Sequence, residues 1–333
     1  MIREASQRVS CCLEIVMGTH PLVVHTETIG NAARAWLAER AEVVAAAADQ
    51  PDFEALAPRI DALLVRTYTD VDDALLDRLP KLKVVGRAGV GVDNIDVAAC
   101  RRRGVEVVYA PASSTNAVAE YVVALLCDAL RPRVYLQEAE ERSRWSHHRK
   151  TLVATRQFDE LTLGILGMGR IGTTVAGFAN ALGFQTIAAD LESIPTECRH
   201  GAEMVSTEEL FTRADVLTIH VDGRRANRGL IGDDLLDRMK PDAVLINTSR
   251  GFVMQHDPLR EILAERTEMR AFLDVHDPEP PPPGDRLFTL PNAHLLPHLA
   301  SRTETAMARM SDVVRDIWAV LEGHEPKWPA PND

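Results

Sequence analysis

Three glycines that follow an apolar segment constrain the fold more than any other feature of the chain. Gly167, Gly169 and Gly172 have the spacing G-x-G-x-x-G, and residues 161–166 before them are mainly apolar. In such a motif the first glycine permits a tight turn, the second lets the backbone approach a pyrophosphate, and the third allows close packing of helix on strand. The pattern predicts a strand, a turn and a helix whose free N–H groups face phosphates.

An acidic residue strengthens this interpretation. Asp190 ends a second strand-like run, 186–189, at roughly the 20-residue distance that dinucleotide-binding motifs show. Its carboxylate would accept hydrogen bonds from ribose hydroxyls and repel a 2′-phosphate, which favours NAD over NADP. Arg170 and Ile171, inside the motif, are further candidate cofactor-binding residues. A purely structural strand–turn–helix with an ordinary surface aspartate is the alternative.

The rest of the chain alternates short apolar runs with helix-period segments. At roughly 150 residues per domain, 333 residues suggest two domains. Strand and helix in alternation predict an α/β fold with doubly wound parallel sheets. The expected strands cover residues 62–65, 84–85, 105–108, 161–166, 186–189, 216–221, 243–246, 271–275 and 294–296. The expected helices cover residues 31–37, 117–130, 171–182, 207–212, 258–264 and 303–321, and a polar region rich in Arg and His covers 138–150.

Three charged or titratable residues follow expected strands, where open parallel sheets bind ligands. Arg250, Glu279 and His298 come after the runs ending near residues 246, 275 and 296. A guanidinium can hold a carboxylate by two parallel hydrogen bonds. A histidine can exchange a hydroxyl proton near neutral pH, and a neighbouring carboxylate can orient the imidazole and favour its charged form. Each also has an ordinary structural alternative: a solvated arginine, a structural histidine, an exposed glutamate.

These segments together resemble the D-isomer-specific 2-hydroxyacid dehydrogenase family over nearly the whole chain. The similar motifs are the glycine run, Asn247-Thr-Ser-Arg-Gly251, Leu273-Asp-Val-His-Asp-Pro-Glu-Pro280 and Pro297-His298. The resemblance implies that Arg250 binds the substrate carboxylate and carbonyl and that Glu279 pairs with His298. It implies that His298 is the acid/base and lies against the cofactor, and that Asp274 holds the nicotinamide carboxamide. Thr248 is a further candidate cofactor residue.

The resemblance also implies a substrate site and a domain plan. In the loop of residues 86–96, the amides of Val90 and Gly91 would hold the substrate carboxylate. Arg66 would touch the distal part of the substrate, although a structural salt bridge is an equal alternative. The implied substrate domain is flavodoxin-like and discontinuous, 1–110 plus 301–333, and a Rossmann-type NAD-binding domain, 111–300, is inserted into it. The helix expected after Ser114 would support a homodimer.

The chain departs from the family pattern at several positions. Asp222 stands where a proline is usual, which predicts a reshaped region near the nicotinamide. Met254-Gln-His256 replaces the usual acidic segment, and His276 replaces a common aromatic residue. His276, His294 and His298 lack metal-ligand spacing, so no metal site is expected.

Composition limits the possible partners. The net charge of −12 argues against binding to nucleic acid or to an anionic membrane. The five cysteines include no C-x-x-C pair, and reduced thiols in the cytoplasm fit best. No apolar run approaches 18 residues, and charged residues near the N-terminus interrupt any signal-peptide core. The Pro280–Pro283 run is a stiff loop or, alternatively, a polyproline ligand.

We therefore expect an NAD-dependent oxidoreductase that interconverts a D-2-hydroxy acid and its 2-oxo acid. Residues 86–96 are most similar to the phosphoglycerate dehydrogenase branch, which gives a first alternative. A phosphorylated substrate would need more basic anchors than Arg66, and we expect no additional regulatory domain within the 333 residues. The second alternative is an NADH-sensing binding protein similar to the corepressor relatives of the family.

Overall fold

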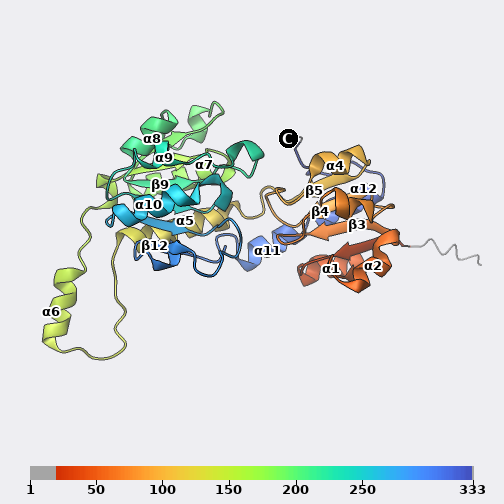
Figure 1. Ribbon diagram of the computed structural model, residues 1–333, viewed down its shortest axis with the longest axis horizontal. Helices are drawn as coiled ribbons and strands as arrows, with labels where there is room; N and C mark the ends of the chain where they lie inside the picture. The colour runs from red at the N-terminus through yellow and green to blue at the C-terminus, as the bar shows by residue number, and fades with distance from the viewer. Residues whose placement is uncertain (1–19, 332–333) are drawn as a thin grey trace, which may run out of the picture.

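The computed structural model describes residues 20–331, which form two lobes, each built on a parallel sheet (Figure 1). All strand pairs in both sheets are parallel. The expected α/β class with doubly wound sheets is confirmed. Cys11, Cys12 and the charged residues near the N-terminus lie outside the described residues.

The first sheet has five strands in the order β2-β1-β3-β4-β5. The strands are β1 (Leu22–His25), β2 (Glu42–Ala45), β3 (Ile60–Val65), β4 (Val84–Arg87) and β5 (Glu106–Tyr109). Helices cover both faces, because the strands are apolar on both. One face packs on α1 (Asn31–Ala38), α11 (Glu304–Ser311) and α12 (Val314–Leu321), and the other on α2 (Pro51–Leu56), α3 (Asp73–Asp77) and α4 (Val97–Arg102).

The second sheet has seven strands in the order β12-β11-β10-β9-β6-β7-β8. The strands are β6 (Thr162–Leu166), β7 (Gln185–Ala189), β8 (Glu203–Met204), β9 (Val216–Ile219), β10 (Val244–Asn247), β11 (Arg270–Leu273) and β12 (Ala293–Leu295). One face packs on α5 (Thr115–Leu130) and α7 (Arg170–Leu182), and the other on α8 (Thr207–Arg213), α9 (Asp233–Leu236) and α10 (His256–Glu265). The order reverses between β6 and β9, the switch point where doubly wound sheets bind ligands.

The C-terminal segment forms two helices instead of the single helix expected over residues 303–321. The break falls at Asp312 and Val313, between α11 and α12. Met310 and Val314, on either side of the break, are both buried in the core that also contains strands of the first sheet. The turn therefore lies between two short helices that both pack on the same face of the first sheet.

The polar region at residues 138–150 contains a helix that the sequence analysis did not predict. This helix, α6 (Arg142–Thr151), buries none of its residues. It stands on a long connection that projects from the seven-stranded lobe (Figure 1). Because α6 packs on neither sheet, the apolar periodicity that marks the other helices is missing from it.

The packing of α11 and α12 supports a discontinuous first domain. Both helices follow the last strand of the second sheet in sequence but contribute to the core of the first. We therefore retain the expected boundaries as a proposal, with a first domain of residues 1–110 plus 301–333 and a second domain of residues 111–300. None of the helices in the described part of the chain is both long enough and apolar enough to span a membrane.

The contact between α12 and the first sheet generates a prediction. Ile317 is fully buried, and its Cδ1 atom fills the space above Gly86 of β4. Ile317→Ala should lower the free energy of unfolding by about 2–5 kcal/mol, the usual cost of emptying a core site. The half-buried Val320 in the same helix is the matched control, and Val320→Ala should cost less. Equal losses in chemical denaturation would contradict the packing described here.

Candidate active site

Neighbouring strands bring the predicted catalytic segments to one edge of the seven-stranded sheet. Asn247 of β10 is in register with Leu273 of β11, which is in register with Leu295 of β12. Since these strands are parallel, the segments that follow them emerge at the same edge. Arg250, Glu279 and His298 are carried by these three segments, so residues far apart in the sequence meet in one region.

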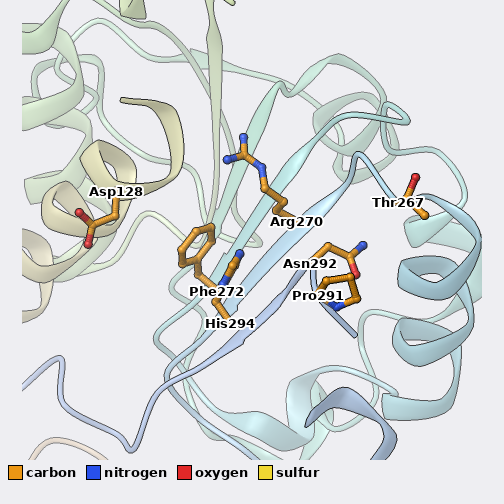
Figure 2. Close-up of a pocket in the computed structure, with 7 residues that line it drawn as sticks. All are labelled: Asp128, Thr267, Arg270, Phe272, Pro291, Asn292 and His294. Carbon is orange, nitrogen blue, oxygen red and sulfur yellow. The ribbon is translucent and has the colours of Figure 1, made fainter. Parts of the chain in front are cut away.

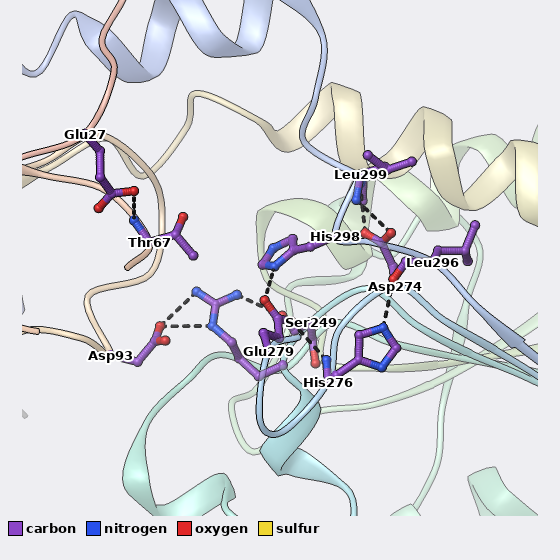
Figure 3. A network of polar contacts seen from close by, with 12 residues as sticks. Glu27, Thr67, Asp93, Ser249, Asp274, His276, Glu279, Leu296, His298 and Leu299 are labelled. Atoms are coloured by element: carbon purple, nitrogen blue, oxygen red, sulfur yellow. Dashed lines mark hydrogen bonds and ion pairs between the residues drawn. The ribbon is translucent and has the colours of Figure 1, made fainter. Parts of the chain in front are cut away.

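Glu279 and His298 form a direct hydrogen bond. The Nδ1 atom of His298 lies 2.8 Å from Oε2 of Glu279, and Oε1 of Glu279 accepts a hydrogen bond of 2.9 Å from the amide of His276 (Figure 3). Burial acts to raise the pKa of Glu279, but these hydrogen bonds outweigh it and hold the pKa below its ordinary value. An ionised carboxylate only accepts, so Nδ1 carries the proton and Nε2 is left to face a substrate.

A turn at the end of β12 holds His298 in place. His298 has a φ of 54°, in the left-handed region, which a residue other than glycine enters only when its surroundings require it. The two following amides, of Leu299 and Ala300, each donate a 2.8 Å hydrogen bond to Asp274. Burial raises the pKa of Asp274, and the two amides act in the opposite direction. Asp274 therefore fixes the turn, while its contact with the nicotinamide remains a prediction.

Arg250 reaches from the second sheet to a loop of the first. Its Nε and Nη2 atoms each lie 2.9 Å from Oδ1 of Asp93, and its Nη1 atom donates to the carbonyl of Ser249 (Figure 3). A Cβ atom on Gly91 would lie only 1.7 Å from Nη2 of Arg250. The structure thus places the predicted carboxylate-binding loop directly against the predicted carboxylate-binding guanidinium. Neither the Val90 amide nor the Gly91 amide donates a hydrogen bond within residues 20–331.

Two charged residues of this region were absent from the sequence prediction. Asp93 pairs with Arg250, and Arg87 lies close by at the end of β4. Burial, and then the charge of Arg250, lowers the pKa of Arg87 to about 10. The Nε atom of Arg87 is buried without a hydrogen-bond partner in the described chain. Both residues lie within residues 86–96, the segment that the sequence analysis singled out for its amides, but the sequence does not show which groups these charges will meet in the folded protein.

The guanidinium of Arg66 is held by groups other than a carboxylate. Its Nη1 atom donates to the carbonyl of Thr28, and its Nη2 atom lies 3.2 Å from the sulfur of Met307 in α11. The structural salt bridge that was an alternative for Arg66 is not among its contacts with the described residues. The guanidinium therefore ties the end of β3 to α11, and its contact with a substrate remains a prediction.

The glycine turn has the shape that a dinucleotide requires. Gly167 has a φ of 94°, and a Cβ there would lie 2.8 Å from the backbone of His220. A Cβ on Gly172 would lie 1.9 Å from the carbonyl oxygen of Gly167, so only glycine permits this approach of turn and helix. Apart from its own chain neighbours, no residue of the described chain lies within 4 Å of the Cβ position of Gly169. The open space is where a pyrophosphate would approach the start of α7.

Asp190 closes the other side of this turn. Its Oδ2 atom accepts a hydrogen bond of 2.5 Å from the amide of Met168, and its Oδ1 atom accepts one of 2.8 Å from the amide of Glu192. The carboxylate is partly exposed and each oxygen has a further lone pair, so it can still accept ribose hydroxyls. Arg170 and Ile171 stand in the first turn of α7, Arg170 exposed and Ile171 half-buried.

Two orphaned polar atoms lie at the same edge of the sheet. The Oγ1 atom of Thr248 and the Nδ1 atom of His220 are buried without a hydrogen-bond partner in the described chain. Burial lowers the pKa of His220 to about 3, so its ring is neutral. Buried polar groups are rarely left unsatisfied, which makes these atoms candidate contacts for a bound group. The open glycine turn and these atoms fit a dinucleotide along this edge.

The segment containing Asp222 is held by an ion pair. The carboxylate of Asp222 binds the guanidinium of Arg224 through hydrogen bonds to both of its oxygens, and it also accepts one from Asn227. The charge on Arg224 lies near Asp190 and Glu192. Asp222 therefore holds Arg224, whose charge lies near the acidic residues that follow β7, and a reshaped region near the nicotinamide remains a prediction.

A separate hollow of about 400 Å³ lies at the opposite edge of the sheet (Figure 2). It is lined by Asp128, Thr267, Arg270, Phe272, Pro291, Asn292 and His294. Arg270 begins β11 and Asn292 precedes β12, so the hollow is at the amino ends of these strands. It therefore lies away from His298 and Glu279, which follow the carboxyl ends. Within residues 20–331, no group of three or more His, Cys, Asp and Glu side chains is arranged to bind a metal ion.

The shifted pKa of Glu279 predicts how acid affects the pair. A carboxyl whose pKa is lowered on folding stabilises the protein above its unfolded value of about 4.3 and loses this effect as the pH falls through the folded value. Glu279→Gln should therefore be less stable than the parent at pH 7, and the difference should narrow below about pH 4. Urea denaturation of both proteins across this range is the measurement. A difference that stays constant into acid would contradict the assignment.

Comparisons with known proteins agree with this geometry. Residues 123–300 match the family model described as D-isomer specific 2-hydroxyacid dehydrogenase, NAD binding domain. D-3-phosphoglycerate dehydrogenase of Archaeoglobus fulgidus is 32% identical over 268 residues, 80% of this chain but 50% of that protein. The chain spans about half the length of such relatives. Glyoxylate reductase of Korarchaeum cryptofilum is 35% identical over 77% of this chain and 78% of its own length.

A solved structure extends the similarity to the whole fold. The crystal structure of a protein from Thermus thermophilus has a TM-score of 0.80 and 32% identity, and the alignment covers 93% of this chain and all of the other. The match includes both lobes, and the family model covers the lobe with the glycine turn. The chain belongs to the D-isomer specific 2-hydroxyacid dehydrogenase family, and its second domain is an NAD-binding domain of that family.

Proposed function

We propose that this chain is an NAD-dependent oxidoreductase that interconverts a D-2-hydroxy acid and the corresponding 2-oxo acid, with His298 as the acid/base. The observation that carries the proposal is the hydrogen bond from Nδ1 of His298 to Glu279, at the sheet edge where Arg250 also emerges. This edge of the sheet supplies a group for proton transfer, His298, and a group for anion binding, Arg250. The glycine turn that would bind the dinucleotide belongs to the same sheet. An oxidoreductase acting on a hydroxyl next to a carboxylate needs both.

The substrate carboxylate is proposed to bind between the two lobes. Arg250 offers a guanidinium, and the amides of Val90 and Gly91 offer two donors with no other partner in the described chain. In this arrangement the substrate carboxylate shares Arg250 with Asp93. Charge-assisted hydrogen bonds of this kind fix the orientation of C2 and polarise the adjacent carbonyl.

Proton transfer is assigned to Nε2 of His298. In oxidation the neutral ring accepts the hydroxyl proton at Nε2, while Glu279 holds the Nδ1 proton and stabilises the resulting imidazolium. In reduction the protonated ring returns that proton to the oxygen of the 2-oxo acid. Bound NAD supplies the hydride acceptor at the nicotinamide, and NADH supplies the donor. His298 is partly exposed, with 37% of its side chain accessible, so a substrate can reach it.

The first prediction from this assignment concerns His298 itself. His298→Asn should lower kcat by about 10²–10⁴-fold, the usual contribution of general acid–base catalysis. The affinity for NADH should stay near that of the parent, because the glycine turn is unchanged. Steady-state kinetics and fluorescence titration with NADH measure the two quantities. A variant with the kcat of the parent would remove His298 from the mechanism.

The second prediction concerns the choice of cofactor. Asp190 and Glu192 place negative charge where the 2′-phosphate of NADPH would lie, so kcat/KM should be higher with NADH than with NADPH. Asp190→Ala should reduce this preference, since the nearby Arg224 then faces less opposing charge. A parent that prefers NADPH would overturn the role given to Asp190.

A phosphorylated 2-hydroxy acid is a second candidate substrate. Arg87 supports it, because this half-buried arginine near Arg250 adds a basic group beyond Arg66. Comparison of hydroxypyruvate with its phosphorylated analogue separates the two candidates. A much higher kcat/KM for the phosphorylated compound favours the phosphoglycerate-type substrate, and similar values favour a small unphosphorylated acid.

The enzymatic proposal is tested most simply by a panel of 2-oxo acids with NADH. Oxidation of NADH that depends on one of them is the expected result. Tight binding of NADH with no turnover on any of them would favour the alternative, an NADH-sensing binding protein. The polar pair of Glu279 and His298 does not by itself separate these functions.

A homodimer in the cytoplasm is also part of the proposal. The connection that carries α6 exposes Val134, Tyr135, Leu136, Trp145 and Val153, which a partner copy would cover. Light scattering should then give twice the 36.7 kDa mass of one chain, and the mass of one chain would reject the dimer.

Cys100, Cys127 and Cys198 are all free thiols, which supports a reducing compartment. The acidic net charge supports a small-molecule substrate in place of nucleic acid.

A further inference from the structure

His276, the residue that departs from the usual aromatic, contacts every segment that carries the proposed catalytic groups. Its amide donates a 2.9 Å hydrogen bond to Oε1 of Glu279. Its ring Nε2 atom lies 2.8 Å from the carbonyl oxygen of Leu296, just after β12 and two residues before His298 (Figure 3). A carbonyl oxygen only accepts, so Nε2 of His276 carries a proton and donates it.

These contacts close a loop of interactions around the acid/base pair. From His276 one path runs through its amide to Glu279 and on to Nδ1 of His298. The other runs through its ring to Leu296 and along the chain to His298. The ends of β11 and β12 are thus joined by a side chain beyond the last backbone hydrogen bond between them, from Leu296 to Leu273.

The third segment, which carries Arg250, lies against the backbone of His276. A Cβ atom on Gly251 would lie 2.0 Å from the carbonyl carbon of His276 and 2.5 Å from its Cα. A movement of His276 would therefore displace the residue next to Arg250 as well. One residue contacts the arginine segment, the carboxylate and the strand end that leads to the imidazole.

We propose that His276 is a positioning residue that sets the distance between Glu279 and His298 through the hydrogen bond from its ring to Leu296. The inference rests on the proposed function, since it assigns His276 a role in that site. It acts through Glu279 and His298, without contact to the reacting atoms. The reason a ring donor matters is that Asp274 holds only the residues after His298, through the amides of Leu299 and Ala300, whereas the His276 ring holds Leu296 before it. Misplacement of a catalytic group by about 1 Å can lower a rate by about 10²-fold.

Two substitutions separate the effect of the hydrogen-bond donor of His276 from the effect of the size of its ring. His276→Phe keeps an aromatic ring and removes the donor, whereas His276→Gln places an amide nitrogen near the position of Nε2 and keeps it. We expect H276F to lower kcat by about tenfold with an unchanged dissociation constant for NADH, and H276Q to retain kcat within about threefold. Thermal unfolding of each variant checks the fold. If H276F does not fold, His276→Asn, whose amide ends short of Leu296, replaces it.

A second measurement does not depend on turnover. With ¹⁵N-labelled histidine, proton–nitrogen spectra detect the Nδ1 proton of His298, which is hydrogen-bonded to Glu279, and the H298N variant assigns its signal. In H276F the looser contact with Glu279 should move this proton resonance upfield, and in H276Q the resonance should stay near the parent position. If no 2-oxo acid is reduced by the parent, the proposed function fails, while the resonance still tests His276. Parent-like kcat and an unshifted Nδ1 proton in H276F, or equal impairment of H276F and H276Q, would overturn the inference.

Discussion

The hydrogen bond between Glu279 and His298 depends on a constraint of parallel sheets, which is that the carboxyl ends of neighbouring strands share one edge. Glu279 follows β11 and His298 follows β12, and no local interaction along the chain would bring them together. Burial alone would disfavour the charge on Glu279, but the amide of His276 and the imidazole keep the carboxylate ionised. The orientation of His298 then follows, because the ionised carboxylate selects the Nδ1 proton and leaves Nε2 free.

A second constraint is that the site is assembled from both lobes. Arg250 comes from the seven-stranded sheet, and Asp93 and Gly91 come from a loop of the five-stranded sheet. The C-terminal helices α11 and α12 return to the first sheet and so tie the lobes together through the chain. A change in the angle between the lobes would therefore alter the contact between Arg250 and Asp93 without disturbing the Glu279–His298 pair.

The sequence predicted the parts of this structure that rest on local patterns. The glycine turn and the strands of continuous Val, Ile and Leu were predicted because turn geometry and burial on both faces restrict residue type locally. Strands β1, β2 and β8 were missed, and the exposed residues of β2 and the two-residue length of β8 explain why those two give little signal. The break between α11 and α12 was missed because apolar periodicity continues across it.

The residues of the candidate site also divide into those that the sequence predicted and those that it did not. Arg250, Glu279 and His298 were predicted from their positions after strands and from the family motifs, and the structure brings their segments together. Asp93 and Arg87 were not predicted, because their roles depend on a loop of one lobe meeting an arginine of the other. Asp274 was predicted as a cofactor contact, and the structure adds that its oxygens hold the turn after His298. Hydrogen bonds from a side chain to backbone amides cannot be predicted from the pattern of residue types, because every residue except proline carries such an amide.

The most direct test of the account is the fate of the transferred hydrogen. NADH carrying deuterium at both C4 positions is incubated with the protein and the 2-oxo acid that it reduces fastest, and the product is analysed by mass spectrometry and chiral chromatography. The account predicts a D-2-hydroxy acid with one deuterium at C2, because the hydride passes directly while His298 supplies the hydroxyl proton. An L product, or a product without deuterium at C2, would contradict it.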